Sequence, residues 1–200
     1  KQHHVIQAAA AGGDPMARLR KIAELWSGGA QKEARRELDA LLTQHPTFAQ
    51  GYLQRAIMVG GGAHQLNKDA FEAAGKALEL GLDGADQRAL AHQLRSLYHL
   101  ERGDGAAAQK ELDAALTPTA MNDPDEILPI RRAELYQLRA QAYRRQGQYE
   151  AAYAEIEQAL KLAREMGLES AIHRYAEEKE IIEKHARRTL TGSLPGPPGQ

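Results

Sequence analysis

Cysteine is absent from the 200-residue sequence, which excludes disulfides, thiolate nucleophiles and cysteine-ligated zinc sites. No run of eighteen consecutive apolar residues occurs either, so the sequence predicts no transmembrane helix. The chain begins at Lys1 rather than at methionine, which leaves open a removed signal peptide or a larger parent protein. A cytoplasmic and a periplasmic location are both compatible with this bacterial-type soluble protein or domain.

An excess of charge of one sign is also lacking, because 26 basic residues stand against 27 acidic ones and the formal net charge is −1. Such a chain has no overall field that would gather nucleic acid, so we expect no nucleic-acid partner. Aromatic residues make up only 5% of the sequence, whereas Ala, Leu, Gln, Glu and Arg, which are strong helix formers, are abundant. The composition therefore predicts an all-α fold.

One pattern of apolar residues, at spacings of four, three and one, occurs four times. These spacings place the four residues of each copy on one face of a helix. The copies are Ala34, Leu38, Leu41 and Leu42; Ala70, Ala74, Ala77 and Leu78; Ala108, Leu112, Ala115 and Leu116; and Ala152, Ile156, Ala159 and Leu160. Gly29, Gly103 and Gly147 precede three of the copies by five residues and predict a turn with positive φ.

The segments before these turns also match one another, with a basic residue and a small residue at fixed places. The matching sets are Tyr52, Arg55, Ala56 and Val59; His92, Arg95, Ser96 and His99; and Tyr136, Arg139, Ala140 and Tyr143, with Arg18, Lys21, Ile22 and Leu25 as a looser first copy. Each unit is thus a helix, a turn and a second helix. Neither helix could bury its apolar stripe alone, so we expect the units to stack.

This pattern resembles the tetratricopeptide repeat (TPR) family over roughly residues 15 to 166. In the fourth copy, Ala140 resembles the small residue of the family, Tyr143 its aromatic residue and Gly147 its turn glycine. The resemblance implies a right-handed superhelical array, or solenoid, of about four TPR-like helix-turn-helix repeats. It also implies a protein-protein interaction scaffold or adaptor without catalytic activity.

The copies are separated by 36, 38 and 44 residues rather than by the 34 of the family, so we expect insertions. We place them at residues 60–68, 82–87 and 118–130, with Pro129 opening the first helix of the fourth repeat. The predicted organisation is a flexible N-terminal segment at 1–13 and a repeat array at 14–166. A capping helix at 167–188 and a disordered Pro/Gly-rich tail at 189–200 follow.

No motif fixes a catalytic, cofactor or metal site, and we expect a protein that is not an enzyme and has no cofactor. The glycine run at 60–62 has neither the Gly-Lys-Ser/Thr motif nor the preceding strand of a phosphate loop. His173 and Glu177 lie one helical turn apart, but a third metal ligand at a predictable spacing is missing, which favours a solvated surface. His92 and His99 occupy places where other copies have packed side chains, so we expect them to pack.

Lys21, Arg55, Arg95 and Arg139 form a basic column, one residue per repeat, where the family more often has leucine. They could bind an acidic partner. Alternatively, their aliphatic stems pack between helices while their charged heads pair with glutamates of the neighbouring helix. We favour the second, structural interpretation.

By resemblance, the first helices of the repeats line a concave groove that binds a partner. The groove-lining residues predicted for this chain are Leu19, Trp26, Leu53, Ile57, Gln93, Leu97, Leu100, Gln137, Gln141 and Arg144. Because many of these are apolar, we expect an amphipathic helix or an apolar peptide, with Glu134 and Arg144 contacting its polar end. The segment VIQAAAA near the N-terminus could instead occupy the groove.

The identity of the protein or peptide partner is not predicted. Two other functions remain possible interpretations of the same pattern: a self-assembling module that forms a homo-oligomer, or a docking or sensory segment of a larger secretion or enzyme complex.

Overall fold

A computed structural model of the chain describes residues 13–60, 68–118 and 126–192, and these ranges contain helices and turns but no strand. The chain divides into two compact units, Lys1–Asp83 and Gly84–Gln200. The division falls within the insertion predicted at 82–87. The predicted flexible segment 1–13 with its VIQAAAA sequence, the insertions at 60–68 and 118–130, and the tail from 193 lie wholly or mainly outside the described residues.

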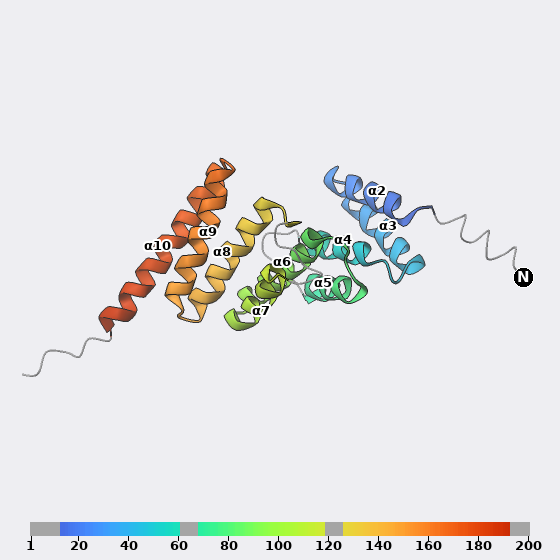
Figure 1. The fold of residues 1–200 in the computed structure, drawn as a ribbon. Coiled ribbons are helices and arrows are strands. Elements are labelled where there is room, and N and C mark those ends of the chain that lie inside the picture. Colours follow the sequence, from blue (N-terminus) through green and yellow to red (C-terminus); the bar gives the residue numbers. More distant parts are fainter. Residues whose placement is uncertain (1–12, 61–67, 119–125, 193–200) are drawn as a thin grey trace, which may run out of the picture. The chain divides into compact units, whose positions relative to one another are not determined.

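The first unit contains two helical hairpins (Figure 1). Its helices are α2 (Pro15–Ser27), α3 (Gln31–Gln44), α4 (Ala49–Gly60) and α5 (Lys68–Leu80). Asp14 caps α2, because its side chain accepts hydrogen bonds from the backbone N–H groups of Met16 and Ala17. The cap and Pro15 at the first helical position fix where this helix begins.

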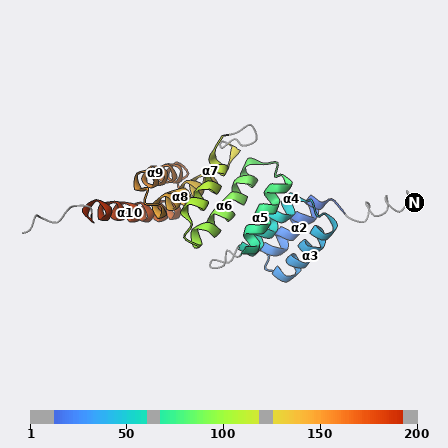
Figure 2. The ribbon, with the colours of Figure 1, turned by 90° about the horizontal axis from the view of Figure 1, so that it is seen from below.

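The second unit contains two hairpins and a long final helix. Its helices are α6 (Ala85–Glu101), α7 (Gly105–Leu116), α8 (Pro129–Arg145), α9 (Tyr149–Glu165) and α10 (Glu169–Gly192). Pro129 opens α8, as the sequence predicts. In Figure 2, α9 lies above the line of α8 and α10, and it contacts both helices.

The repeated apolar pattern forms the core of every hairpin. All of its sixteen residues are buried except Leu78, which is half-buried. The small side chains allow the two helices of a hairpin to approach closely, and the larger ones, such as Leu38, Leu112 and Ile156, cluster with apolar residues of other helices in the same unit. The spacing in the sequence therefore identified the buried face of each second helix correctly.

Glycines with positive φ connect the helices, as predicted for three of them. Gly29, Gly103 and Gly147 have φ values of 86°, 78° and 74°. Only glycine adopts this region without strain between its side chain and its own backbone. The turns are therefore encoded locally by single residues.

The final helix α10 covers the apolar face of the last hairpin, because Tyr175 and Ile182 are buried against α8 and α9 residues. It continues to Gly192, beyond the end predicted at residue 188. Among the described residues, no helix combines the length and the apolar character needed to span a membrane.

Candidate functional site

The first helices of successive hairpins contact one another within each unit. In unit 1, α2 contacts α4; in unit 2, α8 contacts α6 on one side and α10 on the other. We call the surface formed by these helices the first-helix face of each unit. It is the part of each unit on which the predicted groove-lining residues lie.

On the first-helix face of unit 1, most of the apolar side chains predicted to line the groove are buried or half-buried by packing within the unit. Leu53 is only 6% exposed, and Ile57 is half-buried. Leu19 and Trp26 are half-buried and pack against the core cluster around Ile22. The guanidinium carbon of Arg35 on α3 lies 5.4 Å from the centre of the Trp26 ring, so the ring is also covered by a cation.

On the first-helix face of unit 2, polar side chains connect α6 to α8. Arg131 donates hydrogen bonds to Asp86 at 2.9 Å and to Gln93 at 3.0 Å. Gln93 in turn donates to Glu134 at 3.0 Å. Glu134, predicted to contact a polar group of the ligand, therefore already accepts a hydrogen bond within the chain.

The two apolar residues of α6 that we predicted to line the groove, Leu97 and Leu100, lie largely in the core beneath this face. Leu100 is 4% exposed, whereas Leu97 is half-buried and packs against the core of the unit. Of these two leucines, Leu97 has the larger accessible surface for a partner.

At the other end of α8, Arg144 donates a hydrogen bond to Glu178 of α10 at 2.7 Å. Both side chains are largely buried, so this charge pair fixes α10 against α8. The sequence analysis did not identify Glu178. The available signal was an acidic residue in the buried stripe of α10, three residues after Tyr175 and four before Ile182.

Gln137 and Gln141 lie between these two connections. Together with Glu134 and Arg144 they follow one face of α8 at spacings of three, four and three residues, and both glutamines are half-buried. A glutamine amide offers two donors and one acceptor oxygen. This pair is thus the central polar feature of the first-helix face of unit 2.

The basic column has the structural role that we favoured, at least in unit 2. Arg139 of α8 makes a bidentate pair with Glu155 of α9, at 2.9 and 3.0 Å, and a further bond to Asp113 of α7 at 3.0 Å. Arg95 of α6 contacts Glu111 of α7 at 2.8 Å. These charges join the two helices of each hairpin, and Arg139 also joins neighbouring hairpins.

The electrostatics of these pairs favour the charged forms. Burial would raise the pKa of Glu111, but hydrogen bonds from His92 and Arg95 and the charge of Arg95 lower it to about 2. His92 therefore belongs to a packed, hydrogen-bonded group, as predicted. Burial would lower the pKa of Arg139, but Glu155 and Asp113 outweigh that effect and raise it.

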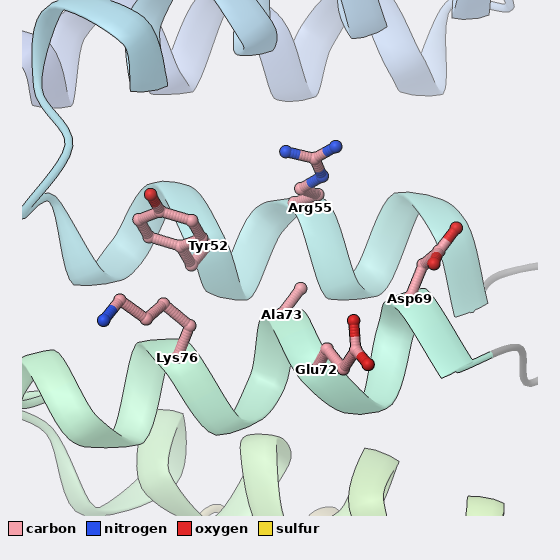
Figure 3. A pocket seen from close by; sticks show the side chains of 6 residues that line it. All are labelled: Tyr52, Arg55, Asp69, Glu72, Ala73 and Lys76. Carbon is pink, nitrogen blue, oxygen red and sulfur yellow. The ribbon is translucent and has the colours of Figure 1, made fainter.

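In unit 1, the same interfaces between the two helices of a hairpin are open. A hollow of about 230 Å³ lies between α2 and α3, lined by Arg18, Lys21, Ile22, Leu25, Glu33 and Glu37. A second hollow of about 300 Å³ lies between α4 and α5, lined by Tyr52, Arg55, Asp69, Glu72, Ala73 and Lys76 (Figure 3). We call the latter the α4–α5 hollow.

No set of three or more His, Asp or Glu side chains in the described part of the chain is arranged to hold a metal ion. His173 and Glu177, which we considered as metal ligands, are both exposed on α10.

Comparison with known proteins identifies solved structures with a similar fold. No protein-family model matches the sequence, and no curated protein matches it. A crystal structure of TTC0263, a thermophilic TPR protein in Thermus thermophilus, is similar over 83% of this chain and 81% of that chain, with 20% sequence identity and a TM-score of 0.56. The crystal structure of the MamA protein is similar over 92% of this chain and 98% of that chain, with 15% identity and a TM-score of 0.57.

The chain therefore has the all-α, TPR-like fold that its repeats predict.

Proposed function

We propose that this chain is a non-catalytic protein-interaction module that binds a peptide segment of a partner protein on the first-helix face of unit 2. The observation that carries the proposal is the position of Gln137 and Gln141. They are half-buried in the middle of α8, and the polar groups on either side of them hold α8 against α6 and α10.

Such a face is preorganised for binding. The two connections, Gln93 to Glu134 and Arg144 to Glu178, limit movement of α8, so little conformational entropy is lost when a partner binds. The amides of the glutamines can bond to the backbone of a peptide, and Leu97 adds apolar contact. Of the ten groove residues predicted from the sequence, Gln137, Gln141 and Leu97 thus carry the proposed contacts in unit 2.

The remaining predicted residues divide into three groups. Gln93 and Arg144 make the hydrogen bonds that hold α8 against α6 and α10. Leu53 and Leu100 are buried and support the surface rather than contact a partner. Leu19, Trp26 and Ile57 belong to unit 1, where they would form a separate and smaller contact area. The polar character of the unit 2 face favours a peptide bound through its backbone over the amphipathic helix or apolar peptide that the sequence predicts.

The test is selection of binding peptides from a displayed random library on the immobilised full chain, followed by affinity measurement in solution. We expect the double substitution Gln137→Ala/Gln141→Ala to weaken the selected peptides at least about tenfold, equivalent to about 1.4 kcal/mol. The matched control is Gln158→Ala, because Gln158 is an exposed glutamine on α9.

If the double variant and the Gln158→Ala control bind the selected peptides with equal affinity, the proposed binding site on α8 is refuted. Sedimentation of the chain at several concentrations tests the rival interpretation. A stable dimer whose formation the double substitution abolishes would show that the same face binds a second copy of the chain instead of a partner protein.

A further inference from the structure

A comparison of the four hairpins shows one missing charge. Three residues after the first alanine of the repeated apolar pattern, the sequence has Glu37, Glu111 and Glu155 in the first, third and fourth hairpins. In the second hairpin, Ala73 takes that place, three residues after Ala70. The basic column, in contrast, continues through all four hairpins.

In unit 2 the glutamate at this place is the partner of the basic column. Glu111 pairs with Arg95 and Glu155 pairs with Arg139, and all four side chains are largely buried. Each of these pairs bridges the two helices of its hairpin, whereas in the first hairpin Lys21 and Glu37 line the hollow between α2 and α3. The local backbone geometry of a hairpin therefore suits an arginine and a carboxylate that face each other.

In the second hairpin, Arg55 lacks this carboxylate. Its nearest acidic partner is Asp39 of α3, at 3.8 Å, and the two side chains are 48% and 65% exposed. Figure 3 shows Arg55 pointing away from Ala73, with the α4–α5 hollow open between α4 and α5. An exposed pair at this distance contributes only about 0–1 kcal/mol, so Arg55 can turn toward a better partner at little cost.

The charges around the hollow limit what can enter it. Tyr52 and Lys76 lie at one end, and Asp69 and Glu72 lie at the other (Figure 3). Lys76 already pairs with Glu79 at 3.3 Å, so a carboxylate beside Arg55 would meet one guanidinium and the phenol of Tyr52. A second carboxylate would meet Asp69 and Glu72. The hollow is therefore suited to one carboxylate and not to a run of acidic residues.

We propose that the α4–α5 hollow binds a single glutamate or aspartate side chain of a partner polypeptide. This carboxylate takes the place that Glu111 and Glu155 occupy in unit 2 and pairs with Arg55. The hollow is open to solvent and small, so the rest of the polypeptide must contact the surface around it to add affinity. This site is separate from the first-helix face of unit 2 and does not depend on the function proposed for that face.

The test uses the full chain and blocked pentapeptides with a central residue between alanines. Binding is followed by NMR through the Nε–Hε signal of Arg55, at millimolar peptide concentration. We expect a saturable shift with the glutamate peptide, at least tenfold weaker binding of the glutamine peptide, and no tighter binding of a triglutamate peptide. Free glutarate should bind more weakly than the glutamate peptide.

Two substitutions test whether the bound carboxylate lies where a glutamate at position 73 would lie. Ala73→Glu supplies it from the chain itself and should abolish the shift while raising the melting temperature by about 2–4 °C. Ala17→Glu is the matched control for binding, because it adds the same charge at an exposed position of α2 and should leave the response of the Arg55 signal to the peptide unchanged. If Ala73→Glu does not fold, Arg55→Gln decides. In this variant binding is followed through the backbone N–H signals of Tyr52 and Ala73, which also line the hollow, and the substitution should remove glutamate-peptide binding without adding a buried group.

The proposal is overturned if the Arg55 signal does not respond to the glutamate peptide, if the glutamine peptide binds equally well, or if Ala17→Glu acts like Ala73→Glu. Equal or tighter binding of glutarate would overturn the assignment to a polypeptide and make the hollow a site for small carboxylic acids.

Discussion

Replacing Arg139 by methionine should destabilise unit 2 far more than the same replacement at Arg55 destabilises unit 1. Arg139 makes three hydrogen bonds to Glu155 and Asp113, at 2.9 to 3.0 Å. Methionine keeps most of the apolar stem of arginine but cannot pair with a carboxylate. The change therefore leaves Glu155 largely buried and without its main cation.

The magnitude follows from the exposure of the groups. Removing one partner of a fully buried ion pair costs about 3–5 kcal/mol. Because the side chains of Arg139 and Glu155 are 17% and 16% exposed, solvent screens part of this, and we expect a loss of about 2–4 kcal/mol. For Arg55, whose pair with Asp39 is half-exposed or more and 3.8 Å long, the expected loss is about 0–1 kcal/mol.

Native-state hydrogen exchange distinguishes the stability losses of the Arg139 and Arg55 variants, because it reports the opening free energy of each helix separately. Protection should fall in α8 and α9 of the Arg139 variant and change little in α4 and α5 of the Arg55 variant. Adding Glu155→Met to Arg139→Met should restore part of the protection, because the buried carboxylate is then gone. Equal losses in the two single variants, or no recovery in the double variant, would refute this account of the basic column.

Three further predictions follow from the geometry. Glu111 has a pKa of about 2 in the folded chain against an ordinary 4.5, so its contribution is complete above pH 4.5 and is lost as the pH falls toward 2. In urea unfolding, wild type should therefore lose up to about 3 kcal/mol more than Glu111→Gln across that range. Gly105→Ala places a Cβ 2.7 Å from the carbonyl oxygen of Ala142 and should cost about 1–3 kcal/mol in thermal unfolding, whereas Gly84→Ala makes ordinary contacts and should cost little. Trp26→Ala should lower the unfolding free energy of unit 1 by about 2 kcal/mol, since the half-buried ring packs on its core; unchanged stability would contradict that role.

The helices and their buried faces could be predicted from the sequence because both depend on residues close together in the chain. The apolar residues that follow Ala34, Ala108 and Ala152 repeat with the period of a helix, which determines the side that packs. Gly147 needs only its own missing Cβ to adopt positive φ. The carboxylate partners of the basic column in unit 2 were expected for a similar reason, since both helices of one hairpin are short and adjacent.

The proposed binding surfaces depend on which residues meet across helices that are distant in the sequence. Periodicity gives the angle of a residue around its own helix, but not the distance to the next helix or the side chain opposite. Arg144, predicted to line the groove, also pairs with Glu178, 34 residues later, and the sequence analysis did not identify this partner. In the same way, Ala73 is an ordinary helix residue in the sequence. Only the tertiary structure shows that Ala73 and Arg55, on two different helices, line the same α4–α5 hollow.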